Sequence, residues 1–238
     1  MSVSMVLGAG KRLYGYFSMR LQLDAVQAFF RFLNVPPKIT ADIGIATRVY
    51  QKMGMGPEIA STSCTHLELG KCPHNFRTVC TGISGKPTLS YSLSCSHQRK
   101  IYHVSEGFAG SKNVKDISKQ DSFIIAVGAE SIYRNFKWTL DVTDTTTEKR
   151  TGVFFIRDES YHKWGHMICG LKVSFIVLFF GQSHIIVQHT SEHFHTLWSL
   201  HMESVRKDVE CTFGILKCRF RILSHPVLCV SNPRPPTK

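Results

Sequence analysis

The spacing of apolar residues along the chain predicts helices first and strands after them. Amphipathic helices are expected over 20–34, which ends before a Pro-Pro pair, and over 41–52, with Thr40 as its N-cap and Gly54 as its stop. Three strand-like runs then follow, each bounded by turn residues: 59–68, 87–95 and 100–107.

The second half of the chain continues the alternation. A short helix is expected over 113–120 and a strand over 136–142. The polar segment TDTTTEKR predicts a turn before the apolar strand 152–158, and a long amphipathic helix is expected over 197–223. Adjacent strands, a crossover, a further strand and a late helix predict an α/β fold, with a mixed sheet flanked by helices.

Two carboxylates lie at positions where active-site residues are expected in such a fold. Asp158 closes the apolar strand 152–158, and ligands of open α/β sheets gather beyond the carboxyl ends of strands. Glu210 lies in the long helix, at the border of its apolar stripe. Each residue also has an ordinary interpretation, because turn aspartates and salt-bridged surface glutamates are common.

The apolar stripe of the long helix defines which of its residues face the core. At about 100° per residue, six positions share one narrow face: Val205, Val209, Thr212, Leu216, Phe220 and Leu223. Basic residues flank Glu210 on the same helix: Arg206, Lys207, Lys217 and Arg221. A lone carboxylate among cations raises the question of what that surface binds.

Charge and composition favour a globular protein with an anionic partner. The apolar content is 43% and the charged content 19%, which is typical of a folded domain. Lys and Arg number 29 against 17 Asp and Glu, so the net charge is +12. Such a surplus suits a polyanion such as nucleic acid, although a solvated basic surface would give the same count.

The eight cysteines favour reduced thiols over a disulfide framework, because no CxxC pair is present. Cys64-Thr65-His66 and Cys95-Ser96-His97 could ligate zinc, but neither has a partner at ligand spacing. The most apolar window, 173–187, is too short and interrupted for a membrane span, which needs about 20 residues. We therefore expect a nuclear or cytoplasmic protein that is neither secreted nor bound to a membrane.

The chain contains three blocks in this order: YQKMGMGPEIASTSCTHLELGKCP, FFIRDESYHKW and RKDVECTFGILKCRFRIL. Together they resemble the Harbinger-like transposases, a family of DDE-superfamily endonucleases. RKDVECTFGILKCRFRIL resembles the family's terminal catalytic helix, with Glu210 at the glutamate position. FFIRDESYHKW resembles the strand that carries the second catalytic aspartate, a position taken by Asp158. YQKMGMGPEIASTSCTHLELGKCP resembles the stretch with the first aspartate, where this chain has Ser63.

The resemblance implies a ribonuclease H-like fold and a metal-dependent nuclease. The family cuts DNA with two divalent metals, so Mg²⁺ or Mn²⁺ would be held by Asp158 and Glu210, while Ser63 takes the place of the first catalytic aspartate as a degenerate position. A serine hydroxyl supplies no anionic ligand, so we expect impaired catalysis. Arg206, Lys207, Lys217 and Arg221 are then expected to contact DNA, with a separate Myb-like protein choosing the target.

The expected organisation is a helical extension over 1–55, a ribonuclease H-like nuclease domain over 56–224 and a disordered tail over 225–238. Residues 172–195 do not match the family and resemble an insert. Two alternatives to an impaired nuclease remain open. One is a domesticated module that binds DNA or protein without catalysis, and the other is the product of a pseudogene.

Overall fold

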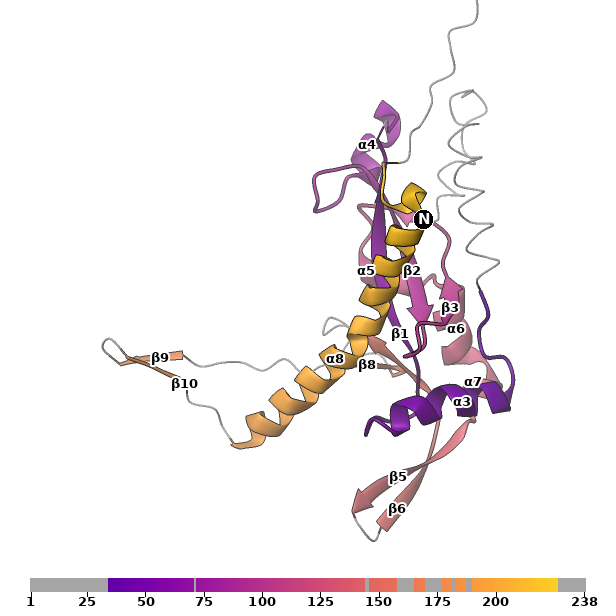
Figure 1. Cartoon of the computed structure of the whole chain (residues 1–238), viewed down its shortest axis with the longest axis vertical. Helices are drawn as coiled ribbons and strands as arrows, with labels where there is room; N and C mark the ends of the chain where they lie inside the picture. The colour runs from indigo at the N-terminus through magenta and orange to yellow at the C-terminus, as the bar shows by residue number, and fades with distance from the viewer. Residues whose placement is uncertain are drawn as a thin grey trace, which may run out of the picture.

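A computed structural model of the protein describes most of the chain (Figure 1), namely residues 34–70, 72–143, 146–157, 165–169, 177–180, 183–186 and 190–226. Within these ranges the backbone alone is described at 140–143, 146, 177–180, 183–186, 190–195 and 222. The helix expected over 20–34 and the tail beyond 226 lie outside the described residues.

A mixed sheet forms the centre of the fold, and its strand order is β3-β2-β1-β7-β8, with the short β4 also paired to β2. The central strand β1 pairs antiparallel with β2 and parallel with β7. The α/β prediction is therefore confirmed. The strands of this sheet are β1 (Glu58–Glu68), β2 (Thr88–Cys95), β3 (Ile101–Val104), β4 (Phe108–Ala109), β7 (Phe154–Arg157) and β8 (Met167–Cys169).

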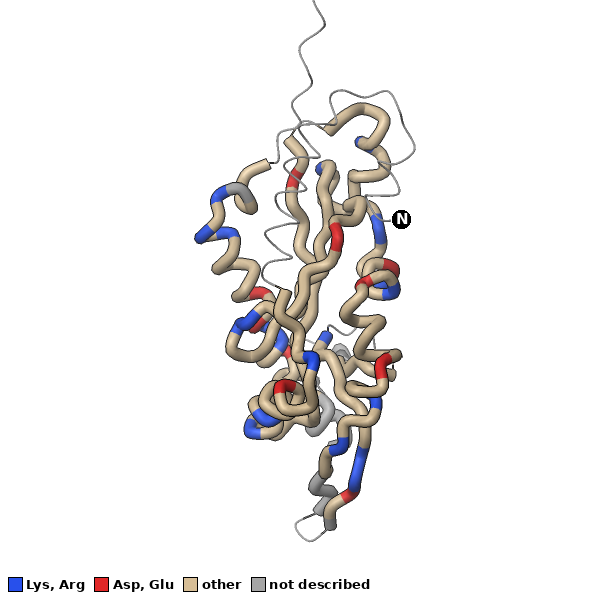
Figure 2. The backbone as a smooth tube through the Cα atoms, turned by 90° about the vertical axis from the view of Figure 1, so that its right-hand side faces the viewer, with Lys and Arg blue, Asp and Glu red and all other residues tan. Residues whose placement is uncertain are grey.

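Helices cover both faces of the sheet, so that the strands run between two helical layers (Figure 2). Val209 and Leu216 of the long helix α8 pack on Leu93 of β2, whereas Phe123 of α6 packs on Phe155 of β7. The helices are α3 (Thr40–Gln51), α4 (His74–Cys80), α5 (Val114–Ser118), α6 (Ser122–Ala129), α7 (Ser131–Arg134) and α8 (Thr190–Arg219), followed by the 3₁₀ turn η2 (Arg221–Leu223). Within the described part of the chain, no helix is long and apolar enough to cross a membrane.

Some helix boundaries differ from those predicted. Thr40 is the first residue of α3 and not its cap, since Ile39 occupies the N-cap position and makes no side-chain hydrogen bond. Gly54 does follow the helix and adopts a φ of 72°, a conformation that glycine takes without strain. The long helix ends at Arg219, so Phe220 lies outside it and is 36% exposed. Its assignment to the core stripe was wrong.

The polar segment TDTTTEKR is not simply a turn. Its second part forms β6 (Thr146–Thr151), which pairs antiparallel with β5 (Lys137–Thr143) in a separate two-stranded ribbon. Threonine has a high strand propensity that its polarity conceals in a search for apolar runs. A second small ribbon, β9 (Val177–Phe180) with β10 (Ser183–Ile186), lies inside the segment predicted to be an insert.

A buried guanidinium ties the sheet to α5. Arg157, the last residue of β7, is 2% exposed and donates to the hydroxyls of Ser118, Thr62 and Ser92, the last two at 3.2 and 3.5 Å. A buried charge requires such polar partners, because its desolvation is otherwise strongly unfavourable. This contact holds the carboxyl end of β7 against β1 and β2.

A second buried ionisable group lies at the start of β1. Glu58 is fully buried, and within the described ranges neither carboxylate oxygen has a hydrogen-bond partner of good geometry. Burial raises the pKa of Glu58, a rise that the nearby backbone N–H groups of Glu58 and Gly56 only partly oppose. In the fold this side chain therefore keeps its proton to a higher pH than in the unfolded chain.

We predict that Glu58 makes the fold less stable as the pH rises. Above about pH 4.3 the unfolded chain releases this proton while the folded chain retains it. The contribution is therefore fully present below that pH and is lost as the pH rises through the raised pKa of Glu58. Urea unfolding of Glu58→Gln at several pH values should show a smaller decline in unfolding free energy than the parent.

The exposed Glu106 provides the matched control for this measurement. Glu106→Gln removes the same charge from the surface and should leave the decline unchanged. Parallel curves for the parent and Glu58→Gln would show that the Glu58 carboxyl is not buried in solution.

Candidate functional site

Ser63 lies in the middle of the central strand, on the face that α8 covers. It pairs with Leu93 across the antiparallel β1–β2 ladder, and residues paired in this way point to the same side of a sheet. Leu93 packs against Val209 and Leu216 of α8. Ser63 itself is half-buried, so its hydroxyl borders the helix without being sealed beneath it.

The long helix runs alongside β1, and the position of Glu210 along it matches that of Ser63. Val205 packs on Ile156, the residue paired with Ser61, while Phe213 lies beside Thr65. The step from Val205 to Phe213 is about 12 Å along a helix. The step from Ser61 to Thr65 is about 13 Å along a strand. Glu210 and Ser63 therefore lie at the same level of the same face.

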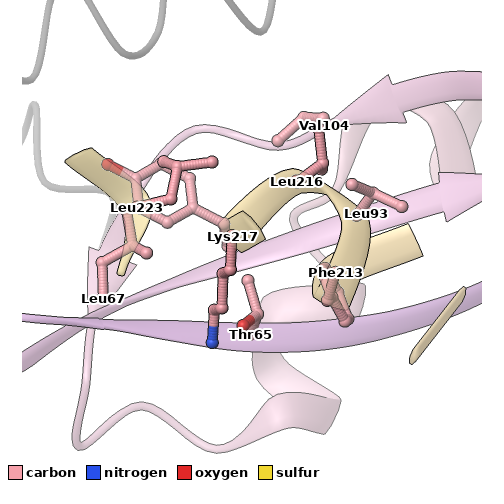
Figure 3. Close-up of a pocket in the computed structure, with 9 residues that line it drawn as sticks. Thr65, Leu67, Leu93, Val104, Phe213, Leu216, Lys217 and Leu223 are labelled. Atoms are coloured by element: carbon pink, nitrogen blue, oxygen red, sulfur yellow. The ribbon is translucent and has the colours of Figure 1, made fainter. Parts of the chain in front are cut away.

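The rotation of α8 places Glu210 on the β1 side of the helix. On the other side, Thr212 donates to Cys95 Sγ at 3.5 Å, and Asp208 accepts from His97 at 2.6 Å. Lys217 lies on the β1 side with its side chain beside Thr65 (Figure 3). Glu210 precedes Lys217 by about two helical turns and so lies on the same flank. This flank faces toward β1 and β7.

The Glu210 carboxylate is held by a neighbouring guanidinium. Arg206 Nη1 donates to Glu210 Oε1 at 2.7 Å, and Arg206 Nε donates to Glu203 Oε2 at 2.8 Å. Burial lowers the pKa of Arg206, but the hydrogen bonds and charges of Glu203 and Glu210 outweigh burial and raise it. The Arg206 side chain is 16% exposed and that of Glu210 is 50% exposed. Two carboxylates thus offset the charge of Arg206.

The predicted second catalytic aspartate, Asp158, lies outside the described residues. The structure does place its neighbour Arg157 at the end of β7, with Nη2 3.2 Å from the hydroxyl of Thr62. Thr62 directly precedes Ser63. The convergence of Ser63, Asp158 and Glu210 therefore stays a prediction, while Ser63 and Glu210 are brought to one face.

The described donors do not fit a pair of divalent metal ions. Hard Mg²⁺ or Mn²⁺ requires several oxygen ligands, preferably carboxylates. Ser63 offers only a neutral hydroxyl, and Glu210 is already paired with Arg206. Glu68, a conceivable substitute, forms an ion pair with Lys86 at 3.0 Å. Within the described ranges, no group of three His, Cys, Asp or Glu side chains could hold a metal ion.

Among the described residues, three of the predicted DNA-contacting residues have no carboxylate partner. Lys207 and Arg221 are exposed, and Lys217 is half-buried beside Thr65 at an apolar pocket between α8 and the sheet (Figure 3). Burial lowers the pKa of His66 on β1, and the positive charge of Lys217 lowers it further. Arg206 differs from these three, since its charge is used inside the protein.

The two Cys-x-His segments serve packing in this structure. His97 binds Asp208 of α8, and His66 Nδ1 lies 2.9 Å from Ser90 Oγ and 3.1 Å from Thr88 Oγ1. The sequence showed no signal for the His97–Asp208 contact, because these residues are far apart in the chain.

The comparison with protein families identifies the class to which this α/β chain belongs. A family model described as plant transposon protein matches residues 31–233, which is most of the chain. The chain therefore belongs to the plant transposon protein family. Searches of the curated proteins and of the solved structures found no match.

We predict that Glu210 and Leu216 differ sharply in their effect on stability. Leu216 is buried against the sheet, so Leu216→Ala should lower the unfolding free energy by about 2–5 kcal/mol. Glu210 forms an exposed i,i+4 ion pair, so Glu210→Gln should change it by less than about 1 kcal/mol. Urea denaturation measures both values. The reverse ranking would mean that α8 is rotated, with Glu210 toward the core.

Proposed function

We propose that this protein is a transposase-derived nuclease domain of the DDE superfamily, Harbinger-like, that has lost its metal site and retains DNA binding. The observation that carries the proposal is the placement of Ser63 and Glu210 at one level of the α8 face, beside the end of β7. A DDE nuclease needs three carboxylates converging at such a place. Two of the three positions are described, and only one of them is acidic.

The chemistry of the described positions favours loss of cleavage. In a two-metal nuclease, carboxylates hold divalent ions that activate water and stabilise the charge on the scissile phosphate. Ser63 removes one anionic ligand from that set. Arg206 forms an ion pair with the carboxylate of Glu210, so that a cation lies near the position that the metal ions would take. These two changes act in the same direction, because both weaken the field that attracts a divalent ion.

Non-specific DNA binding does not require that site. Contacts to phosphate depend mainly on charge in the right region and on the release of counterions. Lys207, Lys217 and Arg221 supply such charge on or after α8, and the whole chain carries +12. Within this proposal the DNA target would be selected by a separate Myb-like protein.

The alternative is a domesticated module that binds another protein. The exposed apolar side chains Leu197 and Leu200 on α8, 50% and 63% exposed, favour it. DNA binding would depend on Lys207, Lys217 and Arg221, whereas protein binding would depend on Leu197 and Leu200. A DNA titration of variants therefore separates the two functions.

We predict that replacing Lys207, Lys217 and Arg221 with Gln weakens binding to a random DNA duplex of any sequence. Each lost phosphate contact should flatten the dependence of log K on log salt by about 0.9. Glu210→Gln should instead strengthen binding slightly, since it removes a negative charge and frees Arg206 from one partner. A salt titration of fluorescence anisotropy measures all variants.

A control variant of equal charge separates position from net charge. Lys112, Lys115 and Lys119 lie in and around α5, on the opposite face of the sheet. Their replacement with Gln lowers the charge by the same three units and should reduce the salt slope much less. Equal loss in both variants would mean that the α8 surface has no special part in DNA binding.

We predict that Ser63→Asp increases affinity for Mn²⁺, because it restores a carboxylate at the level of Glu210. Ser63→Asn has nearly the same shape without the charge and should not. Titration of Mn²⁺ followed by electron paramagnetic resonance measures the affinity without relying on activity. The unmodified chain should show no cleavage of DNA with Mg²⁺ or Mn²⁺. Robust cleavage that Asp158→Ala abolishes would contradict the proposed loss of the site.

A further inference from the structure

The turn between β2 and β3 carries two exposed cations and no acidic residue. It has the sequence SHQRK, from Ser96 to Lys100, and its side chains are exposed at Gln98, Arg99 and Lys100. Three hydrogen bonds close it: Arg99 N donates to Ser96 O at 2.9 Å, Ser96 N to Lys100 O at 2.9 Å, and Lys100 N to Ser96 Oγ at 3.1 Å. The turn therefore has a fixed shape, and the metal site discussed above uses none of its residues.

Arg99 occupies a backbone conformation that glycine normally takes. Its φ is 62°, and among the described residues no other non-glycine residue has a positive φ. A side chain costs free energy in this left-handed region, and a three-residue hairpin loop usually has glycine there. Residues held in such conformations cluster at functional sites. An arginine at a position where glycine would fold more easily indicates that its guanidinium has a use.

His97 fixes the turn against the long helix. Its Nδ1 lies 2.6 Å from Asp208 Oδ2 on α8, and its ring makes an edge contact with Tyr50 of α3, with 6.2 Å between the ring centroids. Lys207 directly precedes Asp208 and is exposed. The contact therefore brings the β2–β3 turn against the helical turn that carries Lys207, a residue of the DNA-binding surface proposed above.

Neighbouring groups also place the side chains of Arg99 and Lys100. Burial raises the pKa of Cys95 to about 12, and the Thr212 hydrogen bond and the charge of Arg99 both oppose this rise. The hydrogen bond from Thr212 Oγ1 of α8 to Cys95 Sγ is 3.5 Å long. The guanidinium of Arg99 thus lies close to the place where β2 meets α8. Lys100 Nζ lies over the ring of Tyr102, 6.0 Å from its centroid.

Cations outnumber carboxylates where the turn meets α8. Within the described ranges, Arg99, Lys100 and Lys207 have no carboxylate partner. Asp208 is the acidic residue at this contact, and it is bound to His97 with its side chain only 12% exposed. The contact therefore neutralises the one carboxylate and leaves three exposed positive charges.

The other acidic residues of the neighbouring helices do not cancel this charge. The two glutamates of α8 with described side chains form ion pairs with Arg206. On α3, which reaches the turn through Tyr50, the carboxylate of Asp42 is outnumbered by Arg48 and by Lys52 at the C-cap. The surface around the turn therefore has a net positive charge.

We propose that the β2–β3 turn binds the phosphate backbone of duplex DNA through Arg99 and Lys100, beside Lys207 of α8. This inference rests on the proposed DNA-binding function and adds residues outside α8 to it. The planar guanidinium of arginine can donate two parallel hydrogen bonds to a phosphate, and lysine adds a point charge. Contacts of this kind position a protein on the duplex without reading its sequence.

A protein partner is a less suitable occupant of this surface. The core of a protein interface is enriched in aromatic residues and depleted of lysine. The exposed side chains of the turn end in an amide, a guanidinium and an ammonium group, and none of them is apolar. A phosphate backbone is complementary to these groups and to the adjoining Lys207 at the same time.

The test uses the full chain with Arg99→Gly and Lys100→Gln. This turn variant should flatten the slope of log K against log salt on a random duplex by about 1.8, or about 0.9 for each phosphate contact. Glycine takes the left-handed conformation without strain, so Arg99→Gly alone should not lower the urea midpoint of unfolding. Weaker DNA binding by a protein that is no less stable cannot be a result of unfolding.

Two controls separate position from charge. Lys115→Gln with Lys119→Gln removes the same charge from in and around α5 and should leave the salt slope nearly unchanged. Arg99→Lys keeps a cation in the same backbone conformation and should retain the slope of the parent. The inference fails if the α5 variant loses as much slope as the turn variant, or if Arg99→Lys behaves like Arg99→Gly.

A measurement on the unmodified protein provides an independent check. Duplex DNA should protect Lys100 from acylation, detected by mass spectrometry, and should leave Lys115 reactive. The inference is overturned if Lys100 stays equally reactive in the DNA complex, or if the turn variant keeps the affinity and salt slope of the parent.

The outcomes also separate this inference from the function on which it rests. If the parent binds DNA and the α8 variant loses affinity while the turn variant does not, DNA binding stands and the turn contact is wrong. If the turn variant loses affinity while the α8 variant does not, the turn contact stands and the α8 surface is wrong. If the parent does not bind DNA at all, both fail.

Discussion

The double pairing of β1 is the constraint on which the rest of the structure depends. This strand is antiparallel to β2, the next strand in sequence, and parallel to β7, which follows only after α4, three further strands, the helices α5 to α7 and the β5–β6 ribbon. A parallel pair must be joined by a long crossover, and within this one α6 and α7 pack on one face of the sheet, around Phe155. α8 packs on the other face, in the same cluster as Cys80 of α4. The buried Arg157 reinforces the pairing, since it bonds to hydroxyls of β1, β2 and α5.

The packing of α8 on this face stabilises the fold and also sets the position of Glu210. Its buried stripe fixes both the rotation and the axial position of the helix, and these place Glu210 beside the level of Ser63. The contact between His97 and Asp208 adds a polar restraint on the side away from β1. In the same turn of helix, Arg206 neutralises Glu210. Glu210 thus keeps a position that suits a metal ligand, while its ion pair with Arg206 reduces the negative charge available to a metal cation.

Local patterns predicted the elements that have strong periodicity. The strands β1 and β2 and the buried positions of α8 follow from the alternation or spacing of their apolar residues. The short helices α4, α6 and α7 were missed because four to eight residues carry too little periodicity. The family resemblance singled out Ser63 and Glu210, and helix spacing is sufficient to predict the i,i+4 ion pair between Arg206 and Glu210. No pattern indicated the burial of Arg157, because that burial depends on tertiary packing, which a single sequence does not display.

The β5–β6 ribbon has one further property, which lies at its base. Gly152 N donates to Phe136 O at 2.9 Å, so the two ends of the ribbon meet where they leave the body. A segment whose ends meet can change in length without moving the elements on either side, because closing a longer loop adds little entropy cost. The β5–β6 ribbon could therefore become longer or shorter, or be replaced, without a change in the sheet. The length of the ribbon is thus independent of the packing that holds the sheet together.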